Sequence, residues 1–203
     1  MSIEATGETA PRVSGNSTEN AVQLQLFLTR GLVAIVWAAV FAAASDSLTV
    51  GAGVLLVLYP LIDVVGSLID ARSQHGSAQQ LLLAGAAVSA IAAVALGVAA
   101  TGSVANVFAV FGVWAAISGA AQLVVALRRR ALLGNQWPML IAGGVSIIAG
   151  IAYVIAAAGD NPMLNMLVLY AAAGGTDFVI QAWLLARRRR RMATSAGPIL
   201  SAS

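Results

Sequence analysis

Residues 81–130 read LLLAGAAVSAIAAVALGVAATGSVANVFAVFGVWAAISGAAQLVVALRRR, two apolar runs separated by TGS and closed by three arginines. Each run has about 20 residues, which is enough for a helix to cross a hydrocarbon core about 30 Å thick. A three-residue link leaves two helices little choice but to run antiparallel as neighbours. This stretch therefore predicts a transmembrane helical hairpin.

The composition of the whole chain agrees with that prediction. Of the 203 residues, 60% are apolar and 9% charged, with a mean hydropathy of +0.89, whereas soluble domains are about 45–50% apolar. Cysteine is absent and histidine occurs once, so a disulfide framework is excluded and no metal site is expected. No serine nucleophile elbow or metal-ligand cluster is visible. We expect a protein that is not an enzyme and has no cofactor.

Six apolar segments are predicted to cross the membrane, within a domain at 23–188. They cover residues 24–44, 48–70, 78–100, 104–127, 138–158 and 163–186. Residues 1–22 are polar, with too little apolar surface to offset the entropy of ordering, and are predicted to be a disordered cytoplasmic tail. Residues 189–203 are predicted to be a basic cytoplasmic tail.

The links between the segments alternate in charge. SDS, TGS and GDNP contain no arginine, whereas ARSQHGSAQQ, RRRALLGNQWP and the closing RRRRR are basic. Because arginine marks the cytoplasmic side of a membrane protein, both termini are expected in the cytoplasm. The predicted fold is an all-α integral membrane protein built from three tandem helical hairpins. The arginine runs are candidate contacts for anionic lipid headgroups: Arg128, Arg129, Arg130, Arg187, Arg188 and Arg189.

A weak internal repeat relates the odd-numbered segments. A shift of 55 residues aligns Ala34, Ala38 and Ala42 with Ser89, Ala93 and Gly97, and a further 57 aligns Ser89 and Ala93 with Ser146 and Gly150. A small residue at every fourth position forms one stripe on one helix face. Such stripes let helix backbones approach closely in a membrane. The repeat therefore predicts where the helices contact each other.

The even-numbered segments carry polar residues within the apolar runs. Shifts of 55 and then 59 residues align three pairs spaced four apart: Asp63 with Ser67, Ser118 with Gln122, and Asp177 with Gln181. An ionised aspartate deep in a membrane costs about 2.5–3.5 kcal/mol, so such residues usually face the bundle interior or a wet cavity. These six residues are predicted to form an intramembrane polar patch. Its aspartates are candidates either for structural hydrogen bonding or for a protonation-linked role.

Arg30 is the candidate counter-charge for this patch, because it lies about one and a half turns inside the first segment. Three interpretations are open. Its side chain reaches back to the headgroups, it forms a structural ion pair with Asp63 or Asp177, or it belongs to a proton or substrate path.

The six-segment pattern resembles the DUF308 or HdeD family of small bacterial membrane proteins. The resemblance covers about residues 24–188 and rests mainly on RRRALLGNQWPMLIAGGVSIIAG at 128–150, with its basic link, Trp137 and the glycines at 143, 144 and 150. It implies a multi-pass protein of the bacterial plasma (inner) membrane, and a link to acid resistance, which the named family members have. The family provides no catalytic residues to transfer.

The expected function is that of a non-enzymatic, HdeD-like inner-membrane protein in acid or envelope stress. Two alternatives stay open: a transporter or channel for protons or small solutes, and an accessory or scaffold subunit of a membrane complex. The expected partners are the lipid bilayer, including anionic lipids, and either further copies of the chain or another membrane protein. No nucleic-acid partner is expected, because the net charge is only +3.

Overall fold

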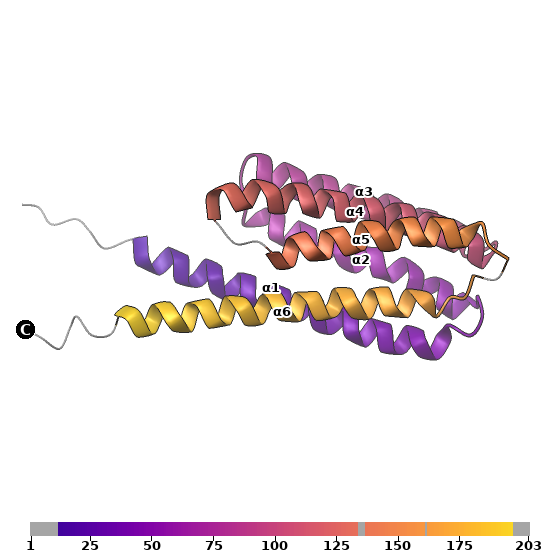
Figure 1. Cartoon of the computed structure of the whole chain (residues 1–203), viewed down its shortest axis with the longest axis horizontal. Helices are drawn as coiled ribbons and strands as arrows, with labels where there is room; N and C mark the ends of the chain where they lie inside the picture. The colour runs from indigo at the N-terminus through magenta and orange to yellow at the C-terminus, as the bar shows by residue number, and fades with distance from the viewer. Residues whose placement is uncertain (1–11, 134–136, 161, 197–203) are drawn as a thin grey trace, which may run out of the picture.

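The structure, a computed structural model, describes residues 12–133, 137–160 and 162–196. Side chains are described over the same ranges except at 12–23, 128–133, 188, 189 and 192–196. The described residues fold into six helices (Figure 1): α1 Arg12–Ala44, α2 Val50–Arg72, α3 Ser77–Ala99, α4 Val104–Leu133, α5 Trp137–Ala157 and α6 Met166–Ala196. The prediction of an all-α fold with six long apolar helices is confirmed.

Each helix contains a stretch that is long and apolar enough to cross a membrane. These stretches are Leu24–Ala44, Val50–Arg72, Ser77–Ala99, Val104–Leu127, Trp137–Ala157 and Met166–Arg187. The bundle also exposes large apolar side chains, among them Leu169 at 75%, Val94 at 72% and Ile91 at 70%. Apolar residues are exposed this widely when acyl chains rather than water surround a helix bundle. The fold is that of a multi-pass membrane protein.

Local sequence signals explain where several helices begin. Thr49 caps α2, since its Oγ1 accepts a hydrogen bond from the amide of Ala52 at 3.2 Å. Ser103 caps α4 in the same way through the amide of Asn106. Gly76 precedes α3 with a φ of +63°, a left-handed conformation that glycine adopts without a steric penalty.

The two terminal helices are longer than the apolar segments predict. α1 begins at Arg12, inside the stretch predicted to be disordered, and α6 continues to Ala196 through the basic run. Extending an existing helix by one residue costs far less than starting a new one, so polar flanking residues can continue an apolar span. Figure 1 shows the start of α1 and the end of α6 at the same end of the bundle.

The closest backbone packing occurs in three helix pairs: α4 with α5, α2 with α3, and α1 with α6. Pairs joined by the short neutral or acidic links are packed less closely, above all α1 with α2 and α5 with α6. Glycines mark two of the close pairs. A Cβ at Gly150 of α5 would lie 2.5 Å from the carbonyl oxygen of Gly112, and one at Gly31 of α1 would lie 2.9 Å from that of Gly175. Link length sets the direction of neighbouring helices, whereas small residues set which backbones meet.

Aromatic side chains fill the centre of the bundle. Tyr59 of α2 lies near three rings on the other even-numbered helices, with centroid distances of 6.1 Å to Phe111, 5.7 Å to Trp114 and 6.4 Å to Tyr170. Phe111 is fully buried and contacts Tyr153 of α5 edge-on. The even-numbered helices therefore converge through rings rather than through their backbones.

Candidate functional site

An ion pair inside the membrane-spanning region joins α1 to α2. Nη2 of Arg30 donates to Oδ1 of Asp63, with 14% of the arginine side chain and 32% of the aspartate side chain exposed. Of the three interpretations of Arg30, the structure shows the ion pair. Two charges that pair in this way avoid the cost that each would carry alone within an apolar medium.

A serine and a tryptophan extend the ion pair across two further helices. Ser89 of α3, 1% exposed, donates its hydroxyl to Oδ2 of Asp63 at 2.8 Å, and Nε1 of Trp114 on α4 donates to the Ser89 oxygen at 3.0 Å. An indole nitrogen is only a donor. The hydroxyl hydrogen of Ser89 is therefore free to point at Asp63. The two hydrogen bonds run in one direction, from the Trp114 donor through Ser89 to the Asp63 carboxylate.

Two residues hold the Arg30 guanidinium in place. A Cβ at Gly66, one turn beyond Asp63 on α2, would lie 2.9 Å from Cζ of Arg30, so the guanidinium packs directly against the backbone of α2 at this glycine. From the other side, the ring of Phe178 on α6 lies 4.8 Å from that Cζ, a cation–π geometry. Arg30 is thus enclosed between α2 and α6 while it reaches Asp63.

None of the hydrogen bonds that the structure describes joins the remaining residues of the predicted polar patch to this ion pair. Asp177 accepts a hydrogen bond of 2.6 Å from Nε2 of Gln181, one turn along its own helix. Ser67 is buried on α2, and Ser118 and Gln122 are half-buried on α4. The structure brings Asp63 together with Arg30 and Ser89, and it brings Asp177 together with Gln181.

The register of α6 explains this separation. In the α4–α5 contact, Gly143 meets Gly119 and Leu123, whereas in the α1–α6 contact, Gly31 meets Gly175 and Val179. Gly175 and Val179 of α6 lie 56 positions after Gly119 and Leu123 of α4. The repeat predicted from the sequence used a shift of 59. By this register Gly174 matches Ser118. Asp177 is three residues farther on, nearly a full turn nearer the basic end.

A second buried serine occupies the matching place in the next repeat. Ser146 of α5, 57 residues after Ser89, donates to the carbonyl of Ala115 at 3.1 Å, and its oxygen lies 2.5 Å from the hydroxyl of Tyr170. In both cases a serine on an odd-numbered helix meets an aromatic polar group on the next even-numbered helix. The predicted repeat positions of Ser89 and Ser146 are thus both polar contacts between helices. The repeat predicted these two positions only as small residues.

Four neighbours of the ion pair were not predicted from the sequence: Ser89, Trp114, Gly66 and Phe178. One signal was available for Ser89, because a polar residue stood within a stripe of alanines. Nothing in the sequence indicated Trp114 or Phe178, since aromatic residues in a transmembrane helix usually have packing or interfacial roles. Gly66 lay one turn from Asp63, but glycine is common in this chain.

The arginine run of α6 is described in part. The Cζ of Arg187 lies 3.7 Å from the ring centroid of Trp183, and both side chains are exposed. The side chains of Arg128, Arg129, Arg130, Arg188 and Arg189 lie outside the described residues. Over the described part of the chain, no group of three or more His, Cys, Asp or Glu residues is placed to hold a metal ion.

Comparison with known proteins identifies one segment. Residues 88–155 match the model of a family described as "Short repeat of unknown function (DUF308)". The match runs from α3 through α4 into α5 and includes Ser89, Trp114 and Ser146. No curated protein and no solved structure matches the chain. Residues 88–155 thus contain a segment similar to the DUF308 repeat, the family that the sequence resembles.

Proposed function

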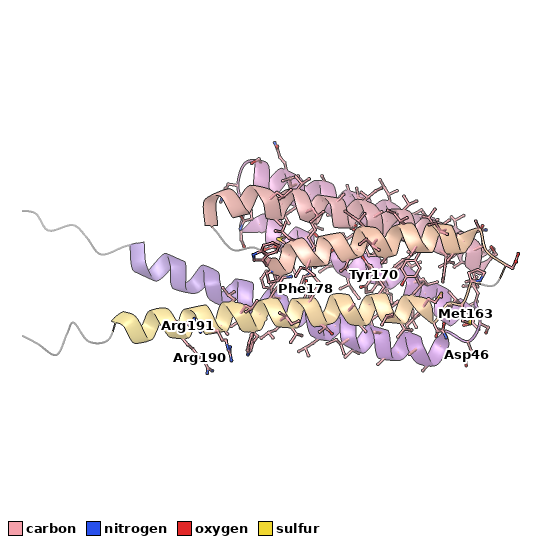
Figure 2. All side chains as sticks on the ribbon, in the orientation of Figure 1. Asp46, Met163, Tyr170, Phe178, Arg190 and Arg191 are labelled. Atoms are coloured by element: carbon pink, nitrogen blue, oxygen red, sulfur yellow. The ribbon has the colours of Figure 1, made fainter. Side chains whose placement is uncertain are left out.

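We propose that this chain is a non-enzymatic, HdeD-like protein of the bacterial inner membrane that acts in acid or envelope stress. The arginine-rich helix ends lie at one end of the bundle, with Arg190 and Arg191 opposite Asp46 in Figure 2. The positive-inside rule assigns that end to the cytoplasm. The stress role rests on the link between named family members and acid resistance.

The observation that carries this proposal is the ion pair between Arg30 and Asp63. The charged group facing Asp63 is Arg30 from α1, and the neutral groups near it are Ser89 from α3 and Tyr59 one turn away on α2. Protonation of the carboxylate abolishes its charge and disturbs an arrangement in which both oxygens accept hydrogen bonds. Acidification of the cytoplasm would then weaken the attachment of α1 to α2.

Replacing both intramembrane aspartates, Asp63→Asn with Asp177→Asn, is expected to remove the acid response. In the wild-type protein, acidification should change the fluorescence of Trp114, because Ser89 joins its indole to Asp63. The double variant should show no such change, and cells that carry it should survive acid less well. The measurements are tryptophan fluorescence of the purified protein between neutral and acidic pH, and survival counts.

A control separates the site from general effects of charge. Asp46 is exposed at the opposite end of the bundle, so Asp46→Asn should leave both readouts as in the wild type. Equal fluorescence changes and equal acid survival for wild type and the double variant would refute the stress role.

A transporter or channel is the second candidate, and the centre of the bundle weighs against it. The rings of Tyr59, Phe111 and Tyr170 contact one another where the even-numbered helices meet, and Phe111 has no exposed surface. The chain from Asp63 also stops at Trp114, whose indole cannot accept a proton. We expect proteoliposomes to show no proton flux, and a flux that Asp63→Asn abolishes would favour transport instead.

Anionic lipids are the proposed partners of the basic end. Arg187 stacks on Trp183 at the end of the α6 span, and tryptophan and arginine are typical anchors at the headgroup level. An accessory or scaffold role would require a protein on one of the exposed helix faces. Purification in mild detergent distinguishes these partners, because a protein partner would be recovered in a fixed ratio.

A further inference from the structure

The six helices divide into two units by the closeness of their packing. α1 and α6 form one unit, here called the outer pair, and they lie along the lower edge of the view in Figure 1. In the other unit, α2 to α5, the α2–α3 and α4–α5 pairs pack closely, and α3 packs against α4 less closely but still more closely than either helix pair at the boundary with the outer pair. Backbone contacts between the outer pair and α2–α5 are sparse, at both the α1–α2 and the α5–α6 boundaries.

Long side chains with polar ends join the two units. Arg30 reaches Asp63, and Nε1 of Trp37 donates to the carbonyl of Leu55 at 2.8 Å. On the α5–α6 side, the hydroxyl of Tyr153 donates to the carbonyl of Met166 at 2.8 Å, and Tyr170 meets Ser146. Polar contacts between membrane helices contribute only about 0.6–2 kcal/mol each. The boundary between the units is therefore held by side chains, including the rings of Trp37 and Tyr170 near Tyr59, rather than by close backbone packing.

Both chain connections between the units lie at one end. The α1–α2 link contains Asp46 and the α5–α6 link contains Met163, and Figure 2 shows these two residues at the same end, away from Arg190 and Arg191. The opposite ends of α1 and α6, at Arg12 and Ala196, are not joined by a link to α2–α5. Arg30 precedes the end of α1 at Ala44 by 14 residues, about 21 Å along the axis. The ion pair thus lies far from the links, where a small rotation about the links produces a large displacement.

From this arrangement we propose that the outer pair is a hinged arm. It pivots on the α1–α2 and α5–α6 links and is closed against α2–α5 by the Arg30–Asp63 ion pair. When the ion pair is broken, the basic end of the arm moves away while the link end stays in place. Hinged motion of this kind keeps each unit rigid and concentrates the change at the few residues of the links. The hinge does not depend on a stress role.

Distances between pairs of spin labels test the hinge, and the chain suits this method because it has no cysteine. Labels replace exposed apolar residues in three pairs: Ile141 with Ile180 across the units at the basic end, Ile155 with Met166 across the units at the link end, and Leu28 with Ile180 within the outer pair. Each pair is measured in bilayers with Asp63 intact, with Asp63→Asn and with the control Asp46→Asn.

We expect Asp63→Asn to lengthen only the distance between positions 141 and 180. The increase should be about 4 Å, the arc that position 180 sweeps in a rotation of roughly 10°, because it lies 14 residues, about 21 Å, beyond the start of α6 at Met166. Asp46→Asn should change none of the three distances. The proposal fails if the distance from 141 to 180 is unchanged, or if the distance within the outer pair lengthens by as much.

The unsubstituted background provides a second test that does not depend on a variant folding. There, the distance distribution between positions 141 and 180 should be broader than that between 28 and 180, because only the first pair spans the hinge. Equal widths would overturn the proposal.

Discussion

Gly150→Ala is expected to lower the free energy of unfolding by about 2–3 kcal/mol, although it adds only one methyl group. The new Cβ would lie 2.5 Å from the carbonyl oxygen of Gly112 and 2.6 Å from the amide nitrogen of Ala116. Both are backbone atoms, so α4 and α5 must separate along their most closely packed contact. This cost exceeds the roughly 1 kcal/mol by which alanine favours a helix over glycine. Reversible unfolding in mixed micelles measures the difference.

Gly144→Ala is the matched control for this prediction. Gly144 lies on the same helix, and a Cβ there would have no neighbouring atom within 4 Å. That substitution should leave the stability unchanged or raise it by up to about 1 kcal/mol. If both variants lost the same stability, close packing at Gly150 would not be the cause.

Asp63→Asn is expected to destabilise the protein by about 2–3 kcal/mol, because it leaves the Arg30 charge without its partner inside a membrane span. Arg30→Gln should have a similar effect for the converse reason. The double variant should regain most of the loss, since neither charge then remains. A double-mutant cycle on the same unfolding assay gives the coupling free energy, which we expect to be about 3–4 kcal/mol.

The cycle also has a built-in comparison. Asp177→Asn removes an aspartate whose described hydrogen bond comes from Gln181 of its own helix. Its coupling to Arg30→Gln should be close to zero. A coupling for Asp177 as large as that for Asp63 would mean that Arg30 pairs with both acids and that our assignment of the ion pair is incomplete.

The six helices could be predicted from the sequence because length and apolarity alone decide a membrane span. The ends of α2 and α3 differ from the predicted ends by two residues or fewer. α1 and α6 differ more, since polar residues continue a helix without contributing to an apolar run. Arg30 and Asp63 could also be recognised from the sequence, because charged residues within apolar spans need partners.

The arrangement of the helices was harder to predict. Short links favour pairs such as α1 with α2, yet the closest contacts lie where Gly31 meets Gly175 and Gly112 meets Gly150. Alanine is so abundant in this chain that its stripes do not distinguish one helix face from another. The predicted register of α6 relied on matching Asp177 with Asp63, because both are aspartates. In the structure, the contact between Gly175 and Gly31 sets the register instead.

The placement of Asp63 against Arg30 within the membrane is the central feature of this bundle. Solid-state NMR of the isotopically labelled protein in lipid bilayers measures this placement as a dipolar coupling between guanidinium nitrogens and carboxyl carbons. We predict a strong coupling in the wild type that disappears in Asp63→Asn and persists in Asp177→Asn. No coupling in the wild type, or a coupling that survives Asp63→Asn, would contradict it.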